Sequence, residues 1–170
     1  WLEWCATCGS EETGGNSVAD QAVIVTVGVS GTPVTPAGQW LQRAVPLASK
    51  YNDLGAAVTV AGNTFKLTTG EYYVDWRTNT LATGRYSVDN ISMAAQSRLF
   101  NVTTGVVEDL GSQSRFSHPA HNWLHSFGAC KLVVSGELVY RLETRWTGAL
   151  NLQDAGVSQD RDEVIIRKVA

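Results

Sequence analysis

Charge of either sign is scarce in this chain of 170 residues. Only 17% of the residues are charged, the formal net charge is −3, and the 13 lysines and arginines form no basic run. Proteins that follow a nucleic-acid backbone need clustered cations to displace counterions. We therefore expect no nucleic acid among the partners of this protein.

Long hydrophobic runs are also absent. No stretch approaches the ~20 consecutive apolar residues that a membrane-spanning helix needs, so we expect no membrane insertion. The apolar share of 44% is nevertheless too high for a disordered chain. The length suits one folded domain, and because the chain opens at Trp1 without a signal-peptide pattern, we interpret it as part of a longer protein.

The chain contains only three cysteines, which is an odd number. Of the three cysteines, Cys5 and Cys8 form a C-x-x-C pair and Cys130 stands alone, so a disulfide framework does not organise the fold. The pair supplies half of a zinc site or a redox pair, but no second pair or nearby histidine completes four ligands. We expect a structural or incidental pair and no cofactor, although copies of the pair could meet on the symmetry axis of an oligomer.

Short β-rich runs between turn residues dominate what is present. In the segment 137–146, Leu138, Tyr140, Leu142, Thr144 and Trp146 alternate with Val139, Arg141, Glu143 and Arg145, which is the period-2 pattern of a half-buried strand. The segment 71–78 alternates in the same way. Further strands are predicted at residues 22–29, 40–45, 57–60, 65–67, 86–93, 98–102, 106–110, 129–134 and 164–169. About ten short strands in one domain predict an all-β antiparallel sandwich or jelly roll.

Two features mark one boundary near residue 35: residues 1–20 are rich in Gly, Ser and Glu, and residues 31–38 are rich in turn residues. We predict an N-terminal stem or connector at residues 1–35 and a jelly-roll head at residues 36–170. Within the head, residues 112–126 are the least strand-like, and they hold all three histidines.

Those histidines are the first candidates for a functional site. His118, His121 and His125 could converge on a metal if the segment were helical, but Pro119 and the lack of a carboxylate or cysteine nearby favour a loop without metal. We predict instead that this loop contacts a ligand, since Trp and His combine contact area with a polar handle. The candidate receptor-binding residues are His121, Asn122, Trp123 and His125. The alternative is a purely structural loop.

Catalytic motifs are missing from the chain: it has no G-x-S-x-G elbow, H-E-x-x-H pair or phosphate-binding glycine loop. Adjacent acidic residues such as Glu108 and Asp109 point to opposite faces of a strand, so they do not form a facing catalytic pair by themselves. We therefore predict that the protein is not an enzyme.

Three successive motifs resemble a known family. Residues 38–43 read G-Q-W-L-Q-R, residues 65–74 read F-K-L-T-T-G-E-Y-Y-V, and residues 98–105 read R-L-F-N-V-T-T-G. In this order they resemble the C1q/TNF-like head domains at the C-terminal ends of bacteriophage tail fibres. The segments 136–142 and 162–169 extend the match. The sequence departs from the family pattern at two places: the family's Asn after the first Leu is absent, and Thr69 replaces its usual Ala or Pro.

The resemblance implies a C1q/TNF-like jelly roll that assembles as a homotrimer, with receptor-contacting loops at its exposed end. It implies a virion protein, located in a tail or head fibre and extracellular, that attaches to a glycan or an outer-membrane protein of the host. Other virion proteins would bind the N-terminal segment. Two alternatives stay open: a capsid decoration or fibre-anchoring protein, and a carbohydrate-active jelly-roll enzyme marked by clustered carboxylates in a concave pocket.

Overall fold

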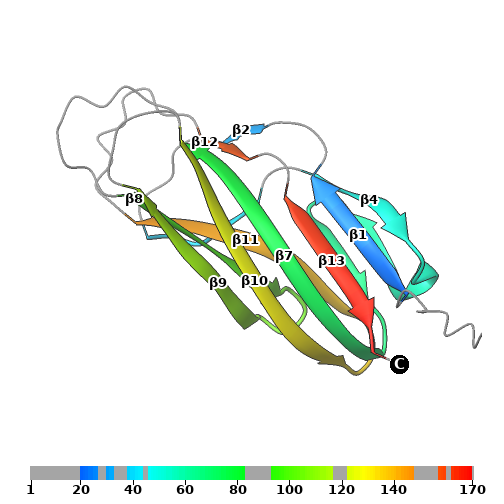
Figure 1. The fold of residues 1–170 in the computed structure, drawn as a ribbon. Coiled ribbons are helices and arrows are strands. Elements are labelled where there is room, and N and C mark those ends of the chain that lie inside the picture. The colour runs from blue at the N-terminus through cyan, green and yellow to red at the C-terminus, as the bar shows by residue number, and fades with distance from the viewer. Residues whose placement is uncertain are drawn as a thin grey trace, which may run out of the picture.

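Two antiparallel β-sheets packed face to face make up the described part of the protein (Figure 1). The computed structural model describes residues 20–26, 30–32, 38–43, 46–82, 93–116, 122–147, 157–159 and 162–169. The helical element in these ranges is one 3₁₀ turn, η1 (Gly55–Ala57), and none of the described residues belongs to a helix long and apolar enough to cross a membrane. The all-β sandwich predicted from the alternating strands is confirmed.

Sheet A, as we call the first layer, contains seven strands. Its main part runs in the spatial order β4 (Leu47–Asn52), β1 (Gln21–Thr26), β13 (Glu163–Lys168), β7 (Gly70–Ala82) and β10 (Asn122–Val134). Beyond β13, the end of β7 pairs with β12 (Val157–Gln159), which in turn pairs with β2 (Ser30–Thr32).

Sheet B, the second layer, contains six strands. Its order is β5 (Val58–Ala61), β6 (Thr64–Leu67), β11 (Leu138–Thr147), β8 (Met93–Asn101) and β9 (Val106–Phe116), with β3 (Leu41–Gln42) paired to β11 beyond β6. The order β1-β13-β7-β10 in one layer and β6-β11-β8-β9 in the other is that of a jelly roll, because successive strands mostly cross between layers as two Greek keys.

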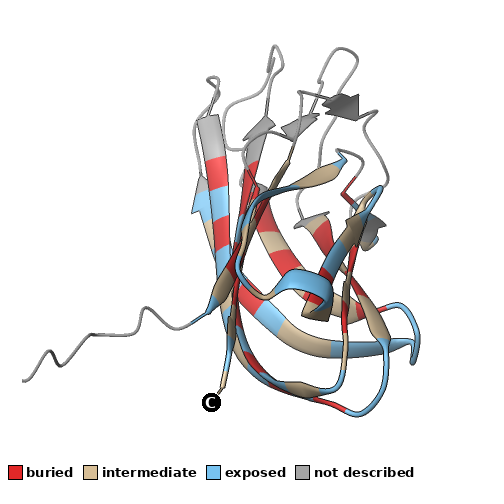
Figure 2. Cartoon of the chain, turned by 90° about the vertical axis from the view of Figure 1, so that its right-hand side faces the viewer, coloured by how far each residue is buried: buried red, intermediate tan, exposed pale blue. Residues whose placement is uncertain are grey.

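The core lies between the two sheets and follows the predicted alternation (Figure 2). On β11, Tyr140 and Leu142 are buried, which confirms the inward face predicted for this strand. Tyr72, Val74 and Trp76 of β7 are buried in the same way. These side chains stabilise the sandwich by removing apolar surface from water, at roughly 25 cal/mol per Å².

The N-terminal boundary predicted at residue 35 does not separate β1 from the head. β1 lies between β13 and β4, and its Ala22 and Ile24 are fully buried. Residues 21–26 of the predicted stem are therefore part of the sandwich. Residues 1–19, with Cys5 and Cys8, lie outside the described residues.

Some strand predictions were wrong. The segment 112–126 is strand over residues 112–116 and 122–126, because polar side chains there make hydrogen bonds within the sandwich. Ser126 Oγ donates to the Ser112 carbonyl at 2.6 Å, and Ser112 Oγ accepts the Phe127 N–H at 3.0 Å. β4 was not predicted, since this outer strand shows no alternation of apolar residues.

The sandwich has two distinct ends. At the basal end, β1 begins at Gln21 opposite Arg167, close to the end of β13. At the distal end, β7 finishes at Ala82 opposite Asn122, the first residue of β10. The chain therefore enters and leaves the described sandwich at its basal end, away from Asn122.

Candidate functional site

The predicted receptor-binding residues fall at the distal end of the sandwich. Asn122, Trp123 and His125 belong to β10 and pair with Ala82, Leu81 and Asn79 of β7. The prediction that they lie in a loop was therefore wrong for these three residues: pairing along the full length of β7 draws them into the sheet. His121 and His118 lie outside the described residues.

His125 is an exposed residue anchored to Asn79. Its Nδ1 lies 2.6 Å from Asn79 Oδ1, an acceptor, so the imidazole donates its Nδ1 hydrogen. Its ring also approaches Phe127, with ring centroids 6.3 Å apart. No group of three or more His, Cys, Asp or Glu that could hold a metal ion is found in the described part of the chain.

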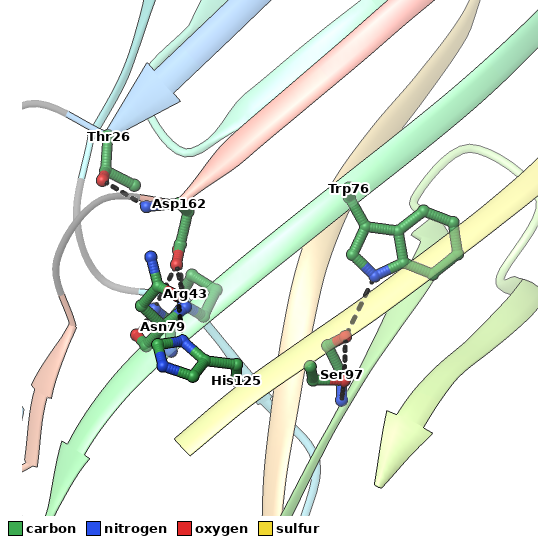
Figure 3. Close-up of polar contacts among 8 residues, drawn as sticks. Thr26, Arg43, Trp76, Asn79, Ser97, His125 and Asp162 are labelled. Atoms are coloured by element: carbon green, nitrogen blue, oxygen red, sulfur yellow. Dashed lines mark hydrogen bonds and ion pairs between the residues drawn. The ribbon is translucent and has the colours of Figure 1, made fainter. Parts of the chain in front are cut away.

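Behind Asn79 lies a buried ion pair that joins the two sheets (Figure 3). Arg43, which follows β3 in sheet B, donates from Nε and Nη2 to the two carboxylate oxygens of Asp162, at 2.6 and 2.5 Å. Asp162 directly precedes β13 in sheet A, and its Oδ1 also accepts the Asn79 N–H at 3.0 Å. A two-pronged pair of this kind fixes orientation as well as distance. The Arg of the G-x-W-x-x-R motif is thus a structural residue here.

A second polar chain crosses the core near Trp76 (Figure 3). The Trp76 indole N–H donates to Ser97 Oγ at 2.9 Å, and Ser97 Oγ lies 2.7 Å from Ser126 Oγ. The ring covers Gly128, where an added Cβ would come within 1.9 Å of it. Sequence reasoning missed this role of Gly128, and a glycine inside a strand was the available signal.

The outer face of sheet A carries exposed apolar side chains. Tyr73 on β7 and Phe127 and Val133 on β10 are 50%, 54% and 72% exposed. Shallow depressions beside Phe127 are lined by Asp75 and Ile165, among others. We call Tyr73, Phe127 and Val133 the apolar face. The ion pairs Lys131–Glu71, Arg167–Asp75 and Arg77–Glu163 lie on the same outer face, so apolar and charged side chains alternate there.

β9, the edge strand of sheet B, also carries exposed apolar residues: Val107 and Leu110 pair with Phe100 and Arg98, and Val106 pairs with the buried Asn101. Val106, Val107 and Leu110 are 53%, 36% and 51% exposed, and we call them the apolar edge. Edge strands with bare apolar residues invite pairing or packing by another chain unless they are covered. Among the described residues, exposed apolar groups therefore lie on β9 as well as on the outer face of sheet A.

No protein-family model matches the sequence, and no curated protein matches it either. Among solved structures, murine APRIL at pH 8.0 is similar, with 8% sequence identity, a TM-score of 0.49 and coverage of 87% of this chain and 98% of that one. Eiger TNF from S. frugiperda has 14% identity, a TM-score of 0.49 and coverage of 89% and 93%. The globular domain of zebrafish complement 1qA has 11% identity, a TM-score of 0.47 and coverage of 89% and 96%. These neighbours are TNF/C1q-like jelly-roll domains.

Proposed function

We propose that this chain is a non-catalytic attachment head that assembles as a homotrimer and is displayed outside the cell, on a bacteriophage fibre. The observation that carries the proposal is the pair of separate apolar surfaces on one chain, the apolar face and the apolar edge. The motif resemblance to phage fibre heads supports the setting.

The two surfaces favour a ring of copies over a simple two-fold dimer. A two-fold contact uses the same patch on both subunits, whereas a contact between a face and an edge is heterologous and closes as a ring when the rotation permits. In such a ring the apolar edge of each copy packs on the apolar face of the next, so that both surfaces are buried. The C1q/TNF-like motifs favour three copies.

The layout of the chain ends supports attachment through the distal end. The N-terminal segment enters the sandwich at the basal end, so a fibre or virion joined there would leave the distal end free. Asn122, Trp123 and His125 belong to the distal part of β10, and His121 directly precedes it. Three copies of a weak binding surface act together, because after the first contact the next is effectively intramolecular.

Three carboxylates of the described residues support a non-catalytic role. Asp162 is held by Arg43, Glu143 by two arginines, and Glu108 by Asn101. They serve structural contacts, whereas a glycosidase needs two carboxyl groups about 5–10 Å apart on either side of a substrate.

A capsid decoration or fibre-anchoring role uses the same trimer and differs only in lacking a host receptor.

Light scattering and cell binding test the proposal together. The purified chain is expected to have a mass of three times 18.4 kDa. Fluorescently labelled protein, applied to a panel of bacterial strains, is expected to bind some strains and to lose about tenfold or more in affinity in Trp123→Ala, since single aromatic residues dominate many interfaces. Tyr51→Ala is the matched control, because Tyr51 is an exposed aromatic residue on β4 of sheet A.

Each outcome separates the candidates. A monomer would overturn the attachment head and favour the carbohydrate-active sandwich. A trimer that binds no strain would favour the structural virion role, and unchanged binding by Trp123→Ala would remove this residue from the site.

A further inference from the structure

The outer face of sheet B carries a cluster of arginine and aromatic side chains that the attachment proposal does not use. We define the arginine cluster as Arg98 and Phe100 of β8, Arg141, Glu143 and Arg145 of β11, and Trp40, just before β3. Along β8 and β11 the arginines alternate with buried residues, so all three point to the outer face of the sheet. The whole cluster comes from one chain.

Glu143 organises two of the arginines. It faces outward, yet only 2% of its side chain is exposed. Arg98 donates to Oε2 from Nε at 2.7 Å and from Nη2 at 2.5 Å, and Arg141 donates to Oε1 from the same two nitrogens at 2.7 and 2.5 Å. Both carboxylate oxygens are therefore occupied, and the charges of Arg98 and Arg141 share one partner.

Arg145 is different. None of the described residues offers it a carboxylate: its Nη2 donates to Gln96 Oε1 at 2.9 Å, and its Nε is buried without a hydrogen-bond partner in the described structure. A guanidinium has five N–H donors, so most of its capacity is unused. Its guanidinium carbon lies 4.7 Å from the centroid of the Trp40 ring, and that of Arg98 lies 4.3 Å from it. Three cations thus gather around one anion and one indole, on a chain whose net charge is −3.

We propose that the arginine cluster binds a carboxylated saccharide, such as a uronic or sialic acid unit. The carboxylate of the sugar accepts hydrogen bonds from the Arg145 guanidinium, whose planar fork matches a carboxylate. The C–H face of the pyranose ring packs against the edge of the Trp40 indole, because the Arg98 and Arg145 guanidinium groups already lie over its ring. The excess positive charge of the cluster attracts an acidic sugar but not a neutral one, so the acidic sugar is expected to bind more tightly.

The arrangement favours an acidic sugar over a nucleic acid. Binding a nucleic-acid backbone takes several cations that each meet a phosphate, whereas Arg98 and Arg141 are already held by Glu143. The cluster lies on the sheet that does not carry the apolar face, and Arg145 on β11 is separated from the apolar edge on β9 by strand β8. The inference therefore stands without the trimer and without the distal residues.

Titration of the whole chain with monosaccharides tests the proposal. D-glucuronate and N-acetylneuraminate are expected to bind with a Kd of about 1 mM, as small ligands with few contacts do, and more weakly at high salt. D-glucose is expected not to bind. Isothermal calorimetry gives the affinity, and NMR of the indole N–H groups reports whether Trp40 is contacted.

Two substitutions and one control locate the site. Arg145→Gln is expected to weaken glucuronate binding about tenfold or more, because a charge-assisted hydrogen bond is lost. Arg145→Lys keeps the charge without the fork, so it retains part of the affinity. Arg115→Gln is the matched control, because Arg115 is an exposed arginine of β9 that also donates to a glutamine, Gln113.

Three results would overturn the proposal: no binding of either acid by the wild-type chain, equal binding of glucose, or full binding by both Arg145 variants. Binding of an oligodeoxythymidine that depends on Arg145, with no binding of the acids, would replace the sugar by a nucleic acid. The light-scattering mass and the effect of Trp123→Ala are independent of these results, so a failure here is distinct from a failure of the attachment head.

Discussion

Arg43 shows how one buried side chain can tie two sheets together. Only 2% of Arg43 is exposed, and the two carboxylate oxygens of Asp162 accept hydrogen bonds from its Nε and Nη2. Arg43→Met leaves a buried carboxylate without its partner, so we expect it to lower the free energy of unfolding by about 3–5 kcal/mol. Urea denaturation measures the loss. The double variant with Asp162→Leu is expected to recover part of it, and a single variant as stable as the wild type would contradict the role of the pair.

A glycine is needed at position 128 because of the neighbouring Trp76 ring and not because of the backbone conformation there. A Cβ at this position would meet the Trp76 ring at 1.9 Å, and the ring is fixed by its hydrogen bond to Ser97. We expect Gly128→Ala to lower the free energy of unfolding by about 1–3 kcal/mol, as overpacking does. Thermal denaturation measures this effect. Ala129→Ser, at an exposed neighbouring position, is the control and is expected to be neutral.

The Cys130 thiol makes the stability of the fold depend on pH in the alkaline range. Burial, together with the charge of Asp109 and Glu108, raises the pKa of its thiol from 9.0 to about 12. Between pH 9 and 12 the unfolded chain therefore releases a proton that the folded chain retains, so stability falls as the pH rises. Cys130→Ala is expected to show a shallower fall in denaturation experiments over this range. Parallel curves for the two proteins would contradict the raised pKa.

At the scale of elements, the strand patterns predicted more of the fold than of the site. On β11 the alternation was predicted correctly for Tyr140 and Leu142, which are buried, whereas Glu143 of the predicted polar face is also buried, because Arg98 and Arg141 hold its carboxylate. The C-terminal end of β7 and the N-terminal end of β10 were not predicted, because each strand continues for as long as its partner offers backbone hydrogen bonds. The arginine cluster was missed as a group, since Trp40, Arg98 and Arg145 come from three separate strand regions that only the folded sheet brings together.

The two faces of β11 give a direct test of this pattern. Leu142→Asp places a charge in the core, which costs several kcal/mol, and we expect it to prevent folding. Val139→Asp, three residues earlier and on the outward face, is expected to remain soluble and folded. Circular dichroism and solubility distinguish the two variants. A native-like Leu142→Asp would show that the faces are inverted.

At the scale of the whole molecule, the proposed contact between copies depends on where the apolar surfaces lie. The apolar face belongs to sheet A, and the apolar edge belongs to β9 of sheet B. Figure 1 shows β9 on the side of the sandwich opposite β4 and β1. A sequence alone cannot show this layout, because the outward residues of a strand read the same whether water or another subunit covers them.

Mixing two complementary variants tests the central claim, a heterologous contact between copies, most directly. Phe127→Asp damages the apolar face and leaves the edge intact, whereas Leu110→Asp damages the edge and leaves the face intact. Each variant alone is expected to be a monomer by light scattering, and the mixture is expected to form a heterodimer of twice 18.4 kDa through its one intact contact. Thr59→Asp, on β5 at the other edge of sheet B, is the control and is expected to remain a trimer. A mixture that stays monomeric, or a Leu110→Asp variant that assembles like the wild type, would contradict the account.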